Sequence, residues 1–414
     1  MKKTLSFILT LSLCFTLAAC GNDTNKPAKE EETTLAKEEV TEAPKKTEAE
    51  ATTEASTETE AEAEAEEETS DKEAAVDDKK ETAADKYQLK DGIVREASID
   101  DYNFELTEEE QKAMEKEPMY GKAIHYWIAD GCTSGPAVAD LLGYYEDAGL
   151  KAEGVRGNSY TEALGTRATD VAVGHIATML VPCTNGVKLT FTGAAHVGCK
   201  SLYVLADSDY QSTSDLKGKV ISTPNGIGAS DYNITCMMFD ADGINPLTEV
   251  ELTPVETSAC VAAMERGEIA AALLSDTFAY HMVQDGKLRV VRSLTWDEDF
   301  QKLPCCIVAM SEEFVEENPV HAKLVTECVK KAHCWMRENP EEATQLLIDE
   351  GLNSEDFDMN VELNQSLHFG LTDEFGLEGL KHIANKYIKL GLITSTDNLD
   401  EVIDKAWTDV DDAK

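Results

Sequence analysis

Five short segments of this chain carry residue types that bind small molecules, and each flanks the end of a predicted strand. Two of them, residues 131–135 and 225–231, are glycine-rich turns that enter a predicted helix. Free backbone N–H groups at such a turn, together with the positive end of the helix, suit a carboxylate, a sulfonate or another anion. The other three are 174–175, which ends in a histidine, 198–201, which holds a Cys-Lys-Ser run, and 275–276, which ends in an aspartate.

We predict that these five segments line one cleft, because ligands of open α/β sheets lie beyond the carboxyl ends of the strands. A plainer interpretation exists for each: such turns are common before helices, and His175 or Asp276 could simply cap a helix. The predicted ligand-binding residues are Cys132, Thr133, Ser134, His175, Cys199, Lys200, Ser201, Asn225, Gly228, Ala229, Ser230, Asp231 and Asp276.

The sequence predicts no catalytic residue, no metal and no cofactor. It has no GxSxG elbow, no HExxH and no P-loop, and nothing places a nucleophile beside a base. Nine cysteines lie between residues 132 and 334, most of them inside apolar patterns, where a free Cys packs as a small hydrophobe. No CxxC pair has metal spacing. The minor alternative is a dithiol or a Cys/His metal site where Cys132 and Cys199 flank the cleft.

Alternating strands and helices must position these segments. Strands are predicted at 123–128, 171–173, 187–191, 201–205, 219–222, 270–274, 288–291 and 306–309. One helix is predicted from Pro136 to the stop at Gly149, others end near residues 182 and 243 or span 258–266, and the pattern is helical after residue 312. A short helix with a capping-box pattern begins after Thr107. The alternation predicts the α/β class, with parallel sheets covered by helices.

Several short motifs follow one another between residues 120 and 400. They are Gly135-Pro136, 143–150, 170–174, 215–220, Gly226-Ile-Gly228, 267–269 and Asn339-Pro340. In this order they resemble the nitrate/sulfonate/taurine-type solute-binding proteins of ABC importers, a group that includes binders of bicarbonate and of thiamine precursors.

The resemblance implies a two-lobe, periplasmic-binding-protein-like fold of type II. Each lobe would be a mainly parallel sheet flanked by helices, and two strands near 204–210 and 303–310 would cross between the lobes. Lobe one would comprise 120–206 and 306–414, and lobe two 207–305, after an N-terminal appendage at 91–119. The implied function is capture of a small solute between the lobes by a monomer, and its delivery to an ABC permease with its ATPase subunits.

The resemblance does not choose the solute. We find no clear arginine in the cleft segments, so a strong anion would depend on backbone N–H groups, His175 and Lys200. The strand of Trp127 and the Tyr144-Tyr145 pair are more similar to thiamine-precursor binders, which favours a small heteroaromatic compound. One of Tyr126 and Trp127 is expected in the core, because they alternate along a strand. A lipid-anchored sensor and an enzyme on the same fold remain alternatives.

The N-terminus predicts export. Residues 1–19 have the charges and short apolar run of a signal peptide, and Ala18-Ala19-Cys20-Gly21 resembles the lipobox of bacterial lipoproteins. That resemblance implies cleavage before Cys20 and lipid attachment to it, on the outer face of the cytoplasmic membrane. Residues 20–90 are predicted to form a disordered tether, since 22–86 contain 23 acidic and 9 basic side chains and no aromatic residue. The net charge of −43 argues against nucleic-acid binding and against direct docking on anionic lipid.

Overall fold

The computed structural model describes residues 87–411. The predicted signal peptide, Cys20 and the tether up to residue 86 lie outside the described residues. Tyr87 already belongs to the folded body, because its hydroxyl donates a hydrogen bond of 2.7 Å to the carbonyl of Glu378. Within the described part of the chain, no helix is both long and apolar enough to cross a membrane.

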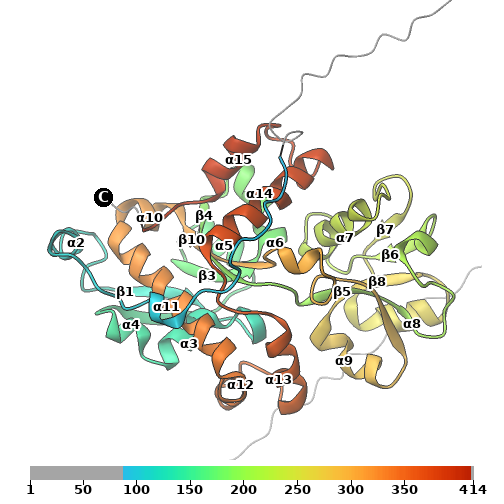
Figure 1. Ribbon diagram of the computed structural model, residues 1–414, viewed down its shortest axis with the longest axis horizontal. Helices are drawn as coiled ribbons and strands as arrows, with labels where there is room; N and C mark the ends of the chain where they lie inside the picture. The colour runs from blue at the N-terminus through green and yellow to red at the C-terminus, as the bar shows by residue number, and fades with distance from the viewer. Residues whose placement is uncertain (1–86, 412–414) are drawn as a thin grey trace, which may run out of the picture. The chain divides into compact units, whose positions relative to one another are not determined.

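The described strands form two five-stranded sheets with equivalent topology (Figure 1). The first sheet has the order β2-β1-β3-β10-β4 and the second has the order β7-β6-β8-β5-β9. The strands are β1 (Ala123–Trp127), β2 (Lys151–Val155), β3 (Val171–His175), β4 (Leu189–His196), β5 (Lys200–Leu205), β6 (Val220–Ser222), β7 (Glu251–Thr253), β8 (Ala271–Ser275), β9 (Leu288–Ser293) and β10 (Cys306–Ser311).

One strand in each sheet runs against the other four. β10 is antiparallel to its neighbours β3 and β4, and β5 is antiparallel to β8 and β9. The remaining pairs, β1 with β2 and β3, and β6 with β7 and β8, are parallel. Each reversed strand is the one that the chain enters on crossing from the other sheet. The predicted fold class, two mainly parallel sheets flanked by helices, is confirmed.

The first crossing lies earlier than predicted. β4 ends the first sheet at His196 and β5 already belongs to the second sheet at Lys200, so the chain crosses at 197–199 and not near 204–210. The return follows β9 and spans 294–305, just before β10, so it overlaps only the start of the predicted 303–310 segment. Residues 200–205, which we had assigned to lobe one, therefore belong to the second sheet as β5. The error arose because the crossings were placed from the family resemblance, and the apolar pattern of strand 201–205 does not reveal which sheet that strand joins.

The helices flank the two sheets. α11 and α14 contact β4 of the first sheet, and α9 contacts β8 and β9 of the second. The helices of the described residues are α2 (Glu108–Met114), α3 (Gly135–Leu141), α4 (Tyr144–Asp147), α5 (Tyr160–Gly165), α6 (Ile176–Thr184), α7 (Ser230–Ala241), α8 (Cys260–Glu265), α9 (Asp276–Gln284), α10 (Glu312–Glu317), α11 (Pro319–Glu338), α12 (Pro340–Asp349), α13 (Phe357–Ser366), α14 (Asp373–Lys389) and α15 (Leu399–Ala406).

Local sequence signals explain most of these boundaries. Thr107 and Glu110 form the predicted capping box at the start of α2. The single helix predicted from Pro136 onward is wrong: it divides into α3 and α4, because Gly143 between them adopts φ +77°. The edge strands β2 and β7 were not predicted. Both are short and contain no fully buried side chain, so no apolar pattern marks them.

The core beneath the first crossing contains two buried histidines. His196 is fully buried at the end of β4, and its ring centroid lies 5.0 Å from that of Phe369. His333 of α11 stacks on the same Phe369, with the ring centroids 5.7 Å apart and an angle of 23° between the ring planes. Among the described residues, neither ring nitrogen of His333 has a hydrogen-bond partner. Burial therefore lowers the pKa of His333 from 6.5 to about 3.

This burial predicts acid sensitivity. Between about pH 6.5 and 3 the unfolded chain protonates His333 and the folded chain does not, so acid favours unfolding. Within this pH range, His333 should lower the free energy of unfolding by up to about 1.4 kcal/mol for each unit that the pH falls. Urea unfolding of the wild type and of His333→Leu at pH 7 and pH 4.5 measures the effect. The wild type should lose more stability than the variant; an equal loss in both would contradict the assignment.

Candidate functional site

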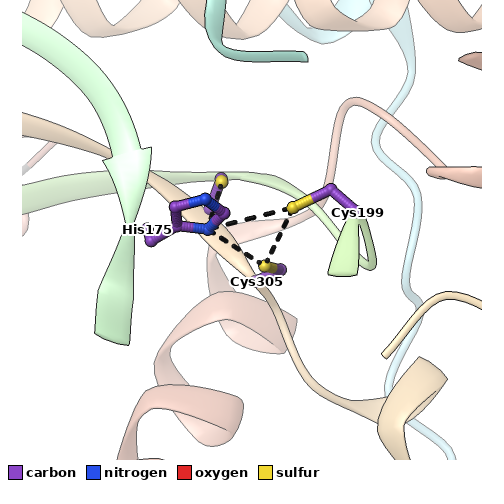
Figure 2. Close-up of side chains that lie close together, drawn as sticks. His175, Cys199 and Cys305 are labelled. Carbon is purple, nitrogen blue, oxygen red and sulfur yellow. Dashed lines mark hydrogen bonds between the residues drawn. The ribbon is translucent and has the colours of Figure 1, made fainter. Parts of the chain in front are cut away.

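A cluster of one histidine and three cysteines lies where the two crossing segments meet the end of β3. His175 is the last residue of β3, Cys199 ends the first crossing, and Cys305 and Cys306 stand at the junction of the second crossing with β10. We call these four residues the crossing cluster. In Figure 2 the Sγ atoms of Cys199 and Cys305 and the imidazole of His175 point toward one another.

The contacts within the crossing cluster are short. His175 Nδ1 lies 3.4 Å from Sγ of both Cys305 and Cys306, and 3.9 Å from Sγ of Cys199. Sγ of Cys199 lies 3.6 Å from Sγ of Cys305. All four potential ligand atoms lie within 4.8 Å of one another. Three sulfurs and one nitrogen therefore surround a common centre.

Strand geometry explains how neighbouring cysteines reach one histidine. Cys306 pairs with His175 across β3 and β10, which places the two residues opposite each other. The pairing of β10 with β4 shifts register between Cys306 and Ile307, an irregularity that turns side chains away from strict alternation. Cys305 precedes the strand, and its carbonyl accepts a hydrogen bond of 3.0 Å from the N–H of Ile176.

Cys199 is held in an unusual backbone conformation. Its φ is +94°, a region that favours glycine, and hydrogen bonds fix it from both sides. Its N–H donates to Thr295 Oγ1 at 2.8 Å, and its carbonyl accepts from the N–H of Asp276 at 3.1 Å. Glycine would adopt this φ without strain, so what Cys199 adds at this position is its thiol.

The thiols of the crossing cluster differ in acidity. Hydrogen bonding with Cys199 lowers the pKa of Cys305 from 9 to about 6. A hydrogen bond from Cys132 likewise lowers the pKa of Cys199, whereas burial raises the pKa of Cys306. Without a metal, the cluster therefore favours partial deprotonation, at Cys199 and Cys305 rather than at Cys306.

Asp276, at the start of the helix that follows β8 of the second sheet, stabilises the crossing segments through hydrogen bonds. It is the first residue of α9 and is buried, while its neighbour Ser275 is the N-cap. Its carboxylate accepts from the Tyr203 hydroxyl at 2.6 Å and from the Thr295 hydroxyl. Burial raises its pKa. Because both oxygens already bond within the protein, the structure gives Asp276 a part in holding Thr295 and Cys199; direct contact with a solute stays a prediction.

The other predicted site residues divide into two groups, those that lie beside the crossing cluster and those whose hydroxyls form hydrogen bonds elsewhere in the protein. Cys132 lies beside the crossing cluster, and Lys200, next to Cys199, pairs with Ser275 at the ends of β5 and β8. Ser201 is buried and donates to Ser293 at 2.8 Å. Thr133 and Ser134 use their hydroxyls locally, on the carbonyls of Asp130 and Gly131.

The glycine-rich turn before α7 is organised by its own residues. Asp231 accepts from the N–H and from the side chain of Asn225, at 2.6 and 3.3 Å. Gly228 is exposed, Ala229 is the N-cap residue of α7, and Ser230 is buried at its first position. No described hydrogen bond of this turn reaches the crossing cluster, so its place in one shared cleft stays a prediction.

Both aromatic residues of β1 are buried. Tyr126 and Trp127 are 6 % and 8 % exposed, so the expectation that only one of them belongs to the core is wrong. Tyr126 donates to Asp140 and stacks on Tyr145, and Trp127 packs edge-on against Tyr160 at 6.4 Å. Neither ring is presented as an open platform for a heteroaromatic solute.

Sequence reasoning missed four residues of this region, Thr295, Cys305, Cys306 and Asn233. Asn233 of α7 donates to the carbonyl of Ala177 of α6 at 2.8 Å and thereby joins the two lobes beside the crossings. An apolar cavity opens there, lined by Ile176, Ala177, Gly198, Met237, Phe300 and Cys305, among others. The adjacent pair Cys305-Cys306 at the end of a crossing segment was the one signal that could have revealed the cluster.

Comparison with known proteins agrees with this architecture. Residues 133–343, half of the chain, match the family described as NMT1/THI5 like. The chain belongs to this family. A protein of Brucella abortus, whose name describes it only as a binding protein, is 25% identical over 233 residues, which are 55% of this chain and 69% of that protein. This family assignment and the fold confirm the resemblance to nitrate- and sulfonate-type solute-binding proteins.

Two solved structures illustrate the similarity in fold. The periplasmic aliphatic sulphonate binding protein SsuA from Escherichia coli aligns with a TM-score of 0.55 at 17% identity, covering 69% of this chain and 92% of that one. The ligand binding component of an ABC-type import system from Staphylococcus aureus, solved with zinc bound, aligns with a TM-score of 0.54 at 13% identity, covering 70% and 98%. At these identities the likeness shows the fold alone.

The network around Asp276 yields a prediction on stability. Asp276→Asn replaces one acceptor oxygen by a donor, so the hydroxyls of Tyr203 and Thr295 lose a charged acceptor. We expect a loss of roughly 1–3 kcal/mol in the free energy of unfolding, measured in urea. The exposed Asp285→Asn, at the other end of α9, is the matched control and should stay within about 0.5 kcal/mol of the wild type. Equal stability of both variants would contradict the proposed support of the crossing.

Proposed function

We propose that this protein is an extracytoplasmic solute-binding protein that captures a small solute between its two lobes and delivers it to an ABC permease. Membership of the NMT1/THI5-like family, on a fold of two equivalent sheets joined by two crossings, carries the proposal. Two short connections between lobes are the usual basis of hinge closure around a ligand. The pivots would be 197–199 and 294–305.

The proposed solute is a small anion of the sulfonate, nitrate or bicarbonate kind, or a small heteroaromatic compound. The sulfonate proteins of the same fold and the glycine-rich turns favour an anion. Lys200 at the end of the first crossing supplies a positive charge near the site. The burial of Tyr126 and Trp127 removes the main argument for a heteroaromatic compound, which stays in the proposal as the second class.

A thermal-shift screen with the full chain tests this proposal. Sulfonates, small carboxylates, nitrate, bicarbonate, pyrimidines and flavin-like compounds form the panel. A true ligand at 100 times its dissociation constant should add about 2.7 kcal/mol to the stability of the folded chain. If a hit were converted into a new product, the protein would be an enzyme. If no member of either class stabilised it, the proposed solute classes would be wrong.

We further propose that Cys20 carries a lipid that holds the protein on the outer face of the membrane, with the acidic segment up to residue 86 as a tether. Cys20→Ala should release the protein into the medium, because one residue would carry the whole attachment. Cys14→Ala, within the predicted signal segment, is the matched control and should stay attached. Fractionation and labelling with a fatty acid measure both. A Cys20→Ala protein that remained in the membrane fraction with its label would refute the anchor.

A further inference from the structure

The crossing cluster has the composition and the dimensions of a tetrahedral metal site. With Zn–S near 2.3 Å and Zn–N near 2.05 Å, a Cys₃His tetrahedron has S···S edges of about 3.8 Å and S···N edges of about 3.6 Å. The observed distances are 3.6 Å for Cys199 to Cys305 and 3.4, 3.4 and 3.9 Å from the sulfurs to His175 Nδ1. The two remaining S···S edges, from Cys306 to Cys199 and to Cys305, are within 4.8 Å, so the four atoms stand near the positions that such an ion requires.

Burial and backbone geometry also fit a metal site. Cys305 and Cys306 are buried, and His175 and Cys199 are partly buried, so an ion would be shielded from most of the solvent. Cys199 directs its thiol to the cluster from a φ of +94°. A strained residue fixed by its neighbours commonly marks a functional position.

We propose that the crossing cluster binds one thiophilic ion of the Zn²⁺ class through His175, Cys199, Cys305 and Cys306. Three sulfurs and one imidazole in a tetrahedron select zinc-like ions over hard cations such as Mg²⁺ or Ca²⁺. Binding replaces thiol protons by the ion and releases them to solvent. This inference rests on the cluster's geometry and stands whether or not the cleft binds the solutes proposed above.

The position of the ion predicts what it does. Cys199 ends the first crossing and Cys305 ends the second, so one ion would join both connections between the lobes to the end of β3. A bound ion would thus fix the crossing segments relative to each other. The ion is a resident of the protein in this proposal, and Cys132 lies beside it without being one of the four ligands.

Metal titration of the full chain tests the proposal. The protein is reduced, freed of reductant and metal without air, and titrated with Co²⁺ and then with Zn²⁺ in competition with a chromogenic chelator. The wild type should bind one ion per chain, show the intense visible and thiolate charge-transfer bands of tetrahedral Co²⁺, and lose them when Zn²⁺ displaces it. Octahedral Co²⁺ spectra, or no stoichiometric binding, would overturn the proposal.

Two variants distinguish the loss of metal binding from the loss of folding. Cys199→Gly removes a ligand and should fold normally, because glycine accepts the positive φ. Its Zn²⁺ affinity should fall by at least about 100-fold, since even the loss of a supporting residue costs about 10- to 100-fold. Cys260→Ala removes a buried thiol outside the cluster and should bind as the wild type does. Wild-type affinity in Cys199→Gly, or an equal loss in Cys260→Ala, would overturn the assignment.

The remaining alternative is a disulfide between Cys199 and Cys305. Mass spectrometry of the chain as purified, without reductant, decides whether this bond is present. A disulfide that re-forms in the presence of Zn²⁺ and excludes it would overturn the metal site. Free thiols with a bound ion, in a protein purified without added metal, would support it. The solute screen run on Cys199→Gly shows independently whether the cleft works without the ion.

Discussion

The structure depends on the two places where the chain passes from one sheet to the other, at 197–199 and at 294–305. The first passage, 197–199, is so short that it has almost no freedom, and the longer return segment is tied to it at Cys199. The N–H of Cys199 bonds to Thr295 of the return segment, and its carbonyl bonds to the N–H of Asp276 at the start of α9. The short passage and these hydrogen bonds fix where β5 and β10 begin. They also explain why each of these two strands runs antiparallel to the rest of its sheet.

Polar and sulfur-containing side chains lie close together at the crossings because the short first passage brings separate segments of the chain into contact. Buried polar groups must find partners, and here they find them across the crossings: Asp276 holds Tyr203 and Thr295, and the cysteines approach His175. Contacts farther from the crossings also join the lobes, as between Lys386 and Asp240, or His281 and Asp356. These pairs are more exposed and should contribute little to stability. The crossings therefore remain the natural pivots of any motion between the lobes.

The sequence predicted the elements well and the site only in part. Strands with strong apolar patterns, such as 171–175 and 271–275, were recognised, whereas the exposed edge strand 151–155 was not, because its pattern carries no buried face. The first crossing was misplaced because it was taken from the family resemblance, and nothing in the pattern of strand 201–205 tells which of the two sheets it joins. His175 and Cys199 were chosen from their places at strand ends. Their partners Cys305 and Cys306 follow more than a hundred residues later, and only tertiary packing could bring them together.

The charge of the crossing cluster bears on which solute can lie beside it. Without metal, the cluster favours a partly deprotonated, negatively charged state, since the pKa values of Cys199 and Cys305 are lowered while that of Cys306 is raised. Three thiolates around one divalent ion would also leave a single negative charge. In either state an anionic solute in direct contact with the sulfurs would be repelled. For an anionic solute of the kind proposed, we therefore expect contact with Lys200 and the backbone N–H groups of the glycine-rich turns, with the cluster as a neighbour rather than a ligand.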